Sequence, residues 1–406
     1  MRCGVLTKTD WLRLDDAIRP LVKRTLYLPG NASNHYIYGN AGGGAAGIPV
    51  AAELSDVCRV DSAYKLLTTT DRGLRDMAIL DAYSVAISRL GWEATRSELE
   101  AYLSGSIENA FRAPASQLRS VWTEARKASR RLQVFWSLDP EDVRITCSDT
   151  TITPTHSYRV MRSLHEVLPA DRDRALQDQP NEGKVLACVA ADRASSHLMR
   201  TGAYTHFPDR RFIHRARLNI HPLNGARMWG QADRDQRYRV CGYSRETLPH
   251  DVCHCMAPSA MYTARHNGVA ERLRNPASPR FTVAFAIRPV GDTNLRPDLV
   301  LASGEEAIVL DVACPFENTP DALTNTRNEK VAKYEPVAAY LRRRYQRVTV
   351  AAIVVGALGT WDPANDTVLR RLCARPYLRL FKRLCVSEVI AATRAIYHDQ
   401  VRAGST

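Results

Sequence analysis

The sequence predicts an α/β domain at its C-terminal end, preceded by mostly helical regions and a small module rich in cysteine and histidine. Three observations lead to this prediction. From about residue 256 the apolar pattern runs in the order helix, strand, strand, strand, helix, strand; cysteines and histidines cluster at 241–255; and helical periodicity dominates residues 1–90. A mixed sheet of this kind needs helices on both faces, and the alternation of helices with strands supplies them.

The composition favours a basic, multi-part protein. The 406 residues are 45% hydrophobic and 24% charged, so two or three globular pieces are expected. The net charge of +13 favours a polyanionic partner, nucleic acid before a membrane surface. The alternative is an ordinary solvated surface. Cysteines scattered outside one cluster indicate a reducing compartment. With no signal-peptide core and no apolar run of membrane-spanning length, we expect a soluble intracellular or nuclear protein.

The N-terminal half reads as helices separated by polar segments. Residues 1–90 are predicted to be helical, with a glycine-rich interruption at 27–49. Residues 91–225 are predicted to be a helical, basic connector, whose most basic run is "RKASRR" at 126–131. The Pro, Asp and Gly content marks 168–183 as a surface linker. The predicted organisation therefore has four regions, at 1–90, 91–225, 226–258 and 259–406.

Two strand-like runs in the last region each carry one aspartate. "SGEE" at 303–306 is a turn signal between them. If Gly304 and Glu305 are its central pair, Asp298 lies opposite Asp311. Cross-strand partners on one face have Cβ atoms about 5 Å apart, close enough for two carboxylates to hold one Mg²⁺. A register slip of one residue would place the two acids on opposite faces.

A helix predicted from Thr319 supplies the basic groups of this region. Thr319 is a suitable N-cap, and Pro320 suits the first turn. Lys330 and Lys333 then lie one turn apart on one helix face. A lysine beside metal-bound carboxylates can activate water and neutralise developing phosphate charge, which predicts phosphodiester hydrolysis. The alternative is a set of ordinary solvated charges on a hairpin and a helix.

These residues resemble a known family. "RPD" at 296–298, a second Asp after twelve intervening residues, and "K..KY" at 330–334 resemble the PD-(D/E)xK nuclease superfamily. More narrowly, they resemble the restriction-like endonuclease at the C-terminus of site-specific non-LTR retrotransposons. The resemblance implies a restriction-like αβββαβ core, Mg²⁺ held by Asp298 and Asp311, and catalysis by Lys330 with help from Lys333. The usual lysine position is Ala313, so the lysine has moved to the helix.

The resemblance also raises expectations for neighbouring residues. Glu317, in "CPFEN", is either a further metal or water ligand or a surface charge. Arg265 and His266, in "RHN", either orient the scissile DNA strand or cap a helix. Arg296 and Tyr334 are expected to contact nucleic acid.

The Cys/His cluster resembles the zinc knuckle just upstream of that endonuclease. Three residues match the last three zinc ligands of the family, with eight and four residues between them: Cys241, His250 and Cys255. Structural zinc requires four ligands, and Tyr238 stands in place of the first cysteine. Three residues are candidates to substitute: Cys253, His254 and His266. Otherwise the site has decayed, and the cysteines are ordinary buried residues.

The N-terminal segments "RLDDAIRPLVKRTLYLP" and "GGGAAGIP" resemble the thumb that follows the reverse-transcriptase palm in the same elements. The palm itself is missing. The resemblance implies the C-terminal part of a retrotransposon polyprotein that acts in the nucleus on target DNA and element RNA. It would nick the DNA so that the new 3′ hydroxyl primes reverse transcription. The alternatives are a catalytically inactive nucleic-acid-binding remnant and a cellular nuclease of the resolvase or repair type.

Overall fold

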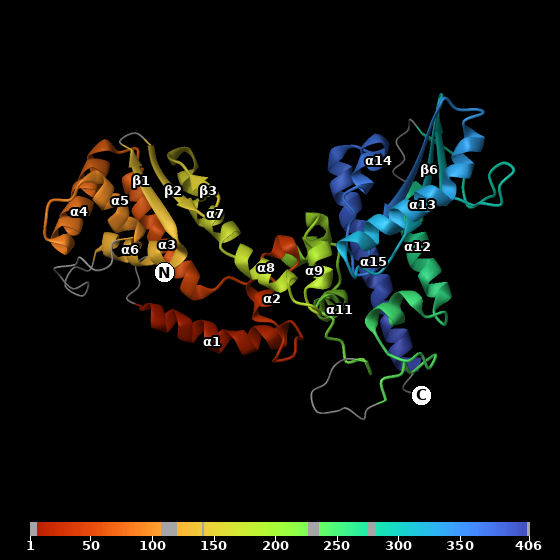
Figure 1. Cartoon of the computed structure of the whole chain (residues 1–406), viewed down its shortest axis with the longest axis horizontal. Coiled ribbons are helices and arrows are strands. Elements are labelled where there is room, and N and C mark those ends of the chain that lie inside the picture. The colour runs from red at the N-terminus through yellow and green to blue at the C-terminus, as the bar shows by residue number, and fades with distance from the viewer. Residues whose placement is uncertain (1–5, 107–119, 140–141, 226–234, 275–280, 404–406) are drawn as a thin grey trace. The chain divides into compact units, whose positions relative to one another are not determined.

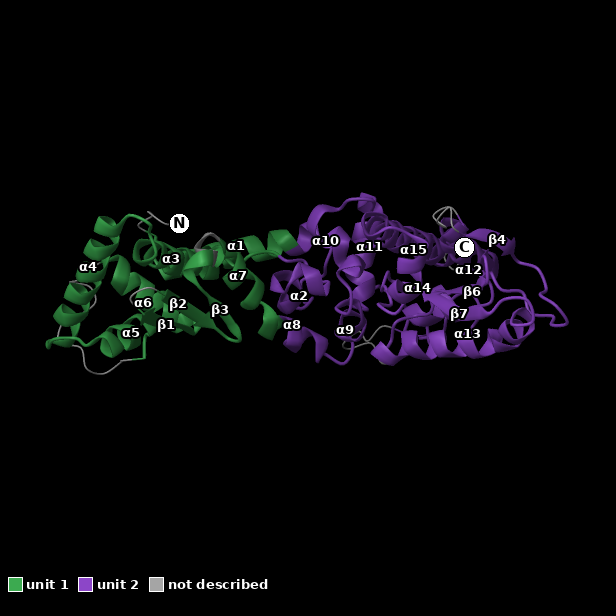
Figure 2. Ribbon diagram, turned by 90° about the horizontal axis from the view of Figure 1, so that it is seen from above, with its two compact units in different colours: residues 1–22, 48–172 green, residues 23–47, 173–406 purple. Residues whose placement is uncertain are grey.

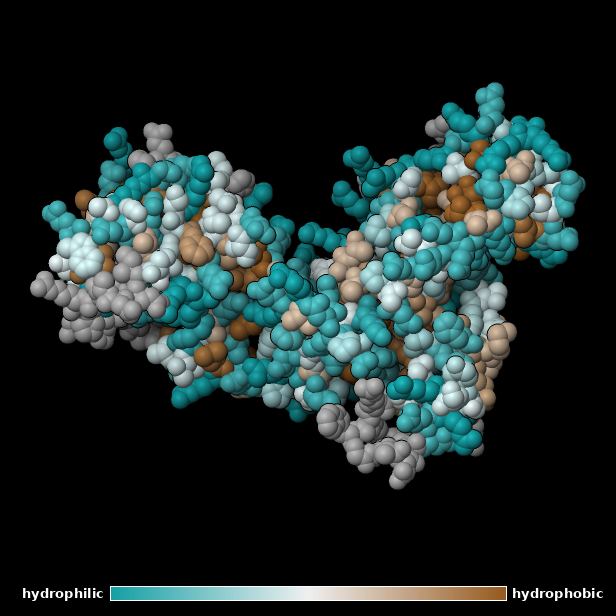
Figure 3. Space-filling model, viewed as in Figure 1, coloured by the Kyte–Doolittle hydropathy of each residue, from teal (hydrophilic) through white to brown (hydrophobic). Residues whose placement is uncertain are grey.

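The chain divides into two compact units, coloured separately in Figure 2. Unit 1 comprises residues 1–22 and 48–172, and unit 2 comprises residues 23–47 and 173–406. The computed structural model describes the chain except at 1–5, 107–119, 140–141, 226–234, 275–280 and 404–406. Among the described helices, none is both long and apolar enough to cross a bilayer. Hydrophilic side chains cover much of the visible face of each unit (Figure 3).

Unit 1 contains helices and one small sheet (Figure 1). In chain order its elements are most of α1 (Lys8–Thr25), α3 (Ala51–Leu67), α4 (Arg72–Leu90), α5 (Arg96–Ser104), α6 (Val121–Leu132), β1 (Val134–Asp139), β2 (Asp142–Cys147), β3 (Thr150–Ile152), a 3₁₀ turn (Pro154–Arg159), α7 (Val160–Val167) and the start of α8 (Ala170–Gln177).

The three strands of unit 1 form an antiparallel sheet in the order β1-β2-β3. Their buried side chains pack with those of α3, α5 and α6 in one hydrophobic core. The Tyr64 hydroxyl donates to the Val143 carbonyl across this core, at 3.0 Å. The sheet lies inside residues 91–225, where the sequence predicted helices. Strands this short give a weak periodic signal, so tertiary packing decides their conformation.

Helix α3 begins against an acid from α1. The first backbone N–H groups of α3, at Ala51 and Ala52, donate to the Asp15 carboxylate at 2.7 and 2.9 Å. These groups have no partner within their own helix, and a carboxylate also suits the positive end of the helix dipole. Asp15 therefore has a structural role in unit 1.

Unit 2 holds the longer helices and the second sheet. Its elements are α2 (Asn34–Tyr38), a 3₁₀ turn (Ala41–Gly43), the rest of α8, α9 (Lys184–Val189), a second 3₁₀ turn (Arg193–Ser196), α10 (His197–Thr201), α11 (Phe207–Arg217), a π-helical turn (His250–His254), α12 (Ser259–Arg274), β4 (Thr282–Phe285), β5 (Leu299–Ser303), β6 (Glu306–Ala313), α13 (Pro320–Leu341), β7 (Arg347–Val354), α14 (Asn365–Leu372) and α15 (Arg375–Ala403).

The sheet of unit 2 follows the element order that the sequence predicted, α12-β4-β5-β6-α13-β7. Its strand order is β4-β5-β6-β7, with β5 antiparallel and β7 parallel to β6. Leu299 pairs with Leu310, and Ser303 pairs with Glu306 across Gly304, which has a φ of 55°. The predicted hairpin register is therefore confirmed.

Every residue of the central strand β6 is buried, so both faces of the sheet are covered. Successive side chains point to opposite faces. Ile308 and Leu310 join the core that includes α12 and α15, whereas Ala307 and Val309 join the core formed with α13. By the same alternation Asp311 belongs to the α13 face. This arrangement brings one acid of β6 towards the helix that carries the two predicted lysines.

The segment 23–47 interrupts unit 1 in sequence but belongs to unit 2. Its apolar side chains, such as Leu28 and Tyr36, pack with Leu186 and Leu218. The Tyr36 hydroxyl also hydrogen-bonds His214 Nδ1 on α11 at 2.7 Å. The segment expected as a glycine-rich interruption therefore supplies part of a core.

Candidate functional site

Asp311 lies on β6 beside Lys330 of α13. The Lys330 Nζ is 2.6 Å from Asp311 Oδ2, and the acid side chain is 5% exposed. The helix that positions Lys330 begins as predicted, with Thr319 at the N-cap and Pro320 in the first turn, although the Thr319 side chain makes no capping bond. The predicted lysine therefore reaches the predicted acid.

Asp298 directly precedes β5 and is held by backbone and imidazole groups. Its Oδ2 accepts the Val312 N–H at 2.7 Å and lies 3.0 Å from His266 Nε2. His266 comes from α12, on the other side of the sheet from α13. Burial lowers the pKa of His266, but the contact with Asp298 outweighs burial and raises the pKa above its ordinary value. A cationic imidazole is thus favoured beside this carboxylate.

Tyr334 links the two acids to α13. Its hydroxyl donates to the Arg296 carbonyl at 3.1 Å, which holds the "RPD" segment against the helix. Burial raises the pKa of Tyr334, and the charges of Asp311 and Asp298 raise it further. Both carboxylates therefore disfavour ionisation of the buried Tyr334 hydroxyl.

Two other predicted residues present charge to solvent near this group. Arg296 is exposed and lies two residues before Asp298. Lys333 is also exposed, and its Nζ lies 4.9 Å from the centre of the Tyr334 ring, within the range of a cation–π contact. Their exposure leaves both side chains accessible to a charged ligand.

Glu317 is completely buried, so the surface-charge alternative is wrong. Its Oε1 accepts the Leu358 and Thr360 N–H groups at 2.9 and 3.2 Å. A Cβ added at Gly356 would lie 2.4 Å from the same oxygen, so the loop after β7 closes tightly around this carboxylate. Burial raises the pKa of Glu317. These contacts make Glu317 the support of the 356–361 loop.

Arg265 is only 4% exposed. Its guanidinium donates to the Val252 carbonyl and to Thr393 Oγ1, both at 3.0 Å. The side chain thus joins α12 to the π-helical turn and to α15. This position does not favour the predicted contact with a DNA strand.

Arg327, on the same helix as the two lysines, was not singled out from the sequence. It lies one turn before Lys330 and forms an ion pair with Asp362, which accepts the Ala364 N–H ahead of α14. The pair ties α13 to the segment that follows β7. The three-residue spacing of Arg327, Lys330 and Lys333 would have placed the arginine on the lysine face.

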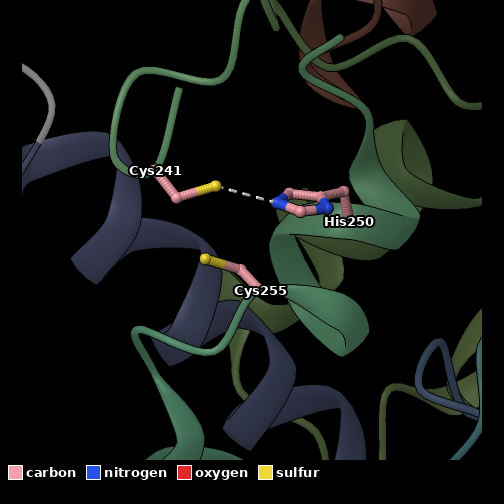
Figure 4. A group of neighbouring side chains, drawn as sticks. All are labelled: Cys241, His250 and Cys255. Atoms are coloured by element: carbon pink, nitrogen blue, oxygen red, sulfur yellow. Dashed lines mark hydrogen bonds between the residues drawn. The ribbon is translucent and has the colours of Figure 1, made fainter. Parts of the chain in front are cut away.

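The second group is the Cys/His cluster shown in Figure 4, where three side chains converge from the loop before the π-helical turn, from that turn and from the residue after it. One ligand atom from each of Cys241, His250 and Cys255 lies within 4.8 Å of the others. Cys241 Sγ is 3.3 Å from His250 Nε2. Within the described ranges, these three residues form the compact Cys/His/acid cluster that could hold a metal ion. The first residues of the predicted knuckle module, 226–234, lie outside the described residues.

The spacing of the cluster fits zinc. A tetrahedral ion with Zn–S bonds of ~2.3 Å and Zn–N bonds of ~2.0 Å would hold its ligand atoms about 3.5–3.8 Å apart. Burial and the neighbouring His254 lower the pKa of His250, which favours the neutral imidazole that binds metals. Burial raises the pKa of the Cys255 thiol, and the charge of a bound ion would favour its deprotonation.

Tyr238 does not supply the fourth ligand. Its hydroxyl donates to Asp251 Oδ1 at 2.9 Å and contacts Gln400 Oε1 at 2.8 Å. Two of the proposed substitutes also point elsewhere, since Cys253 contacts the Cys314 carbonyl and His266 contacts Asp298. Three ligands of the predicted four are therefore brought together.

No family model matches this chain. The chain is similar to a retrovirus-related Pol polyprotein from the type-1 retrotransposable element R2 of Popillia japonica, with 33% identity over 161 residues. This similarity supports a protein of the non-LTR retrotransposon type. The match covers 38% of this chain and 33% of the relative, so it spans a third of the relative's length.

Proposed function

We propose that this chain is the DNA-nicking endonuclease part of a non-LTR retrotransposon protein. The observation that carries the proposal is the contact of Lys330 with Asp311. Asp298 and Asp311 directly adjoin Leu299 and Leu310, the last residue pair of the hairpin. An acid pair with a lysine is the arrangement of the PD-(D/E)xK nucleases. The similarity to a retrotransposon Pol polyprotein supports the same reading.

The donors at this site fit Mg²⁺. Asp298 and Asp311 offer carboxylate oxygens, the ligands that this hard cation prefers, and both are held by contacts with other elements. Bound there, Mg²⁺ would supply Lewis-acid stabilisation of the phosphate and a more acidic water. In this assignment the two aspartates would bind the ion.

The neighbouring residues have separate roles in the proposal. Lys330, beside Asp311, would orient the attacking water and offset charge that develops on the phosphate. The exposed Lys333 and Arg296 would bind flanking phosphates. His266 would position Asp298 through their 3.0 Å contact, and Tyr334 would hold the backbone of the "RPD" segment through its bond to Arg296.

The wider setting of the proposal is target-primed reverse transcription in the nucleus. The nick would leave a 3′ hydroxyl on target DNA, and a palm elsewhere in the polyprotein would extend it along element RNA. The thumb-like N-terminal region would contact nucleic acid. Zinc bound by Cys241, His250 and Cys255 would stiffen the module that leads into α12.

The test of the proposal is nicking of supercoiled DNA by the purified full chain with and without Mg²⁺. Asp298→Ala and Asp311→Ala should each abolish nicking while DNA binding measured by anisotropy stays within about threefold. Asp321→Ala is the matched control, because Asp321 is an exposed acid in the first turn of α13. It should nick at the parent rate.

Two outcomes would overturn the assignment. If either aspartate variant nicks at the parent rate, the metal site lies elsewhere. If the parent chain binds DNA but does not nick it at any Mg²⁺ or Mn²⁺ concentration, the chain is a nucleic-acid-binding remnant.

A further inference from the structure

In the described part of unit 1, four basic side chains line a pocket. Its volume is about 360 Å³, and its lining consists of Arg126, Lys127, Arg130 and Arg131. All four come from α6, where residues three and four positions apart, such as Lys127 with Arg130 and Arg131, are neighbours on the helix surface. Pockets of this size are at the lower end of those that hold small ligands.

The carboxylate of Asp56 holds one of the lining residues, Arg131. Arg131 donates from Nε and Nη2 to the two oxygens of Asp56, at 2.8 and 2.6 Å. Asp56 comes from α3 and has a side chain 1% exposed, and it also accepts from Lys8 Nζ of α1. A bidentate pair of this kind holds the guanidinium in one orientation.

A second acid fixes Lys127. Glu124 lies 3.0 Å from Lys127 Nζ and 2.9 Å from Arg59 Nη1. Burial alone would raise the pKa of Glu124, but Lys127, Arg59 and Arg131 together lower it. The carboxylate is therefore strongly favoured as an anion.

The other two lining residues, Arg126 and Arg130, pack against α5. Arg126 is 7% exposed, and its guanidinium carbon lies 5.5 Å from the centre of the Tyr102 ring on α5. A Cβ added at Gly105 would lie 2.5 Å from Arg130 Cβ, so the end of α5 rests directly on the Arg130 stem. Lys8 and Arg59 pair with the same two acids, Asp56 and Glu124, that hold Arg131 and Lys127.

We infer that this α6 pocket binds the phosphodiester backbone of a nucleic acid. Guanidinium groups match phosphate oxygens, and the ammonium of Lys127 adds a point charge. The lining residues that the structure describes include no aromatic side chain on which a base could stack. The pocket therefore recognises the charge and spacing of the phosphates and not the base sequence.

This inference goes beyond the proposed endonuclease. The pocket lies in unit 1, whereas Asp298, Asp311 and Lys330 lie in unit 2. Its described lining residues include no acid and so offer no carboxylate ligands for a metal. Its role is to anchor a strand, and its test requires no cleavage.

The test compares two double variants of the full chain in EDTA. Lys127→Gln with Arg130→Gln removes two charges of the pocket and leaves Arg59 on Glu124 and Arg131 on Asp56. Arg72→Gln with Arg162→Gln is the matched control, since both arginines are exposed, belong to unit 1 and pair with acids in their own helices. Fluorescence anisotropy with a labelled 20-nucleotide RNA and a 20-base-pair DNA gives affinity over a salt series.

The pocket variant should lose affinity at low salt by about tenfold. The slope of log affinity against log salt should shrink by about 1.4 for the single strand and about 1.8 for the duplex, as for two lost phosphate contacts. A larger loss with one probe identifies which nucleic acid the pocket holds. The control variant should keep the parent slope.

Three results would overturn the inference. The first is a pocket variant that equals its control in both salt slope and affinity. The second is a thermal midpoint that falls further in the pocket variant than in the control, because unfolding would then explain the lost affinity. Finally, if inorganic tripolyphosphate binds the parent at 1:1 and neither probe loses affinity in the variant, the pocket belongs to a small polyanion.

Discussion

The ammonium of Lys330 lies 2.6 Å from Asp311, so an ion pair joins the middle of α13 to the central strand β6. Lys330 is 29% exposed and Asp311 5% exposed, which leaves the lysine the more accessible partner. The pair gives Lys330 two possible functions, positioning the carboxylate and acting on the phosphate. Variants can separate them.

Lys330→Ala should reduce the single-turnover nicking rate at saturating protein by ~10² to 10⁴, the usual effect of losing a positioned proton-transfer group. Lys333→Ala should mainly weaken binding, because Lys333 is exposed and contacts only the Tyr334 ring among the described interactions. Its salt slope should fall by about one unit. Quenched-flow nicking and anisotropy measure the two quantities.

The reverse pattern, a saturated rate lost with Lys333→Ala and kept with Lys330→Ala, would exchange the two roles. Lys330→Arg serves as a control for the ion pair, since it keeps a positive charge beside Asp311 but transfers a proton poorly. If neither lysine variant slows nicking, the helix lysines are not catalytic.

Tyr238→Cys should increase zinc retention, because a thiol three residues before Cys241 would complete the set of four ligands. The metal-free variant should lose about 2–4 kcal/mol of stability, since Tyr238 is 2% exposed and its hydroxyl bonds Asp251 and Gln400. Zinc content after dialysis against a chelator measures the first effect, and urea unfolding measures the second.

Tyr238→Phe is the control for this change. It removes the same hydroxyl but offers no ligand, so its zinc retention should equal that of the parent. Equal zinc content and chelator resistance in the cysteine variant and the parent would show that another residue already completes the site.

Glu317→Ala should destabilise the protein by about 2–4 kcal/mol, because it leaves the buried N–H groups of Leu358 and Thr360 without an acceptor. Glu317→Gln keeps an acceptor oxygen and should cost less. Urea unfolding at pH 7 measures both. Similar costs for the two variants would mean that the charge, and not the hydrogen bonds, supports the 356–361 loop.

Stability should fall as the pH falls from about 6.5 to 4, in part through His214. Burial, together with the charges of Arg210 and Arg217, lowers the pKa of His214 to about 4. The Tyr36 hydroxyl faces the same imidazole. The unfolded chain, with a histidine pKa near ~6.5, binds the proton first, so acid favours unfolding by roughly 2–3 kcal/mol.

His214→Gln tests this dependence. Its urea midpoint should be lower than that of the parent at pH 7 and should change less between pH 7 and pH 4. A parallel pH dependence in the two proteins would assign the acid sensitivity to other groups, such as His221, whose pKa burial lowers to about 3.

The hairpin register and the lysine helix were predictable because their signals are local. The "SGEE" turn fixes which strand residues pair, so the pairing of Leu299 with Leu310, next to the two aspartates, follows from the turn. Thr319-Pro320 marks a helix start in the same way. The resemblance to a zinc knuckle likewise predicted that Cys241, His250 and Cys255 meet.

The remaining features depend on long-range packing, which a single sequence does not display. Glu317 reads as a loop acid, and only the return of the 356–361 segment explains its burial. Arg265 has the sequence context of a ligand-binding arginine, but α15 and the π-helical turn enclose it. The "RKASRR" run was visible in the sequence, but only the structure shows that Asp56 from α3 orients Arg131.

Because residues 23–47 belong to unit 2, they can complete their packing only after residues beyond 173 have been synthesised. Tyr36 precedes His214, its buried partner, by 178 residues. At ribosomal rates of ~5–20 residues per second, His214 is synthesised on the order of 10–35 seconds after Tyr36. The continuous stretch 48–172 can already fold in that interval. The nascent chain must therefore keep Leu28 and Tyr36 soluble in the interval, and a gene fragment that starts at residue 173 would lack the segment altogether.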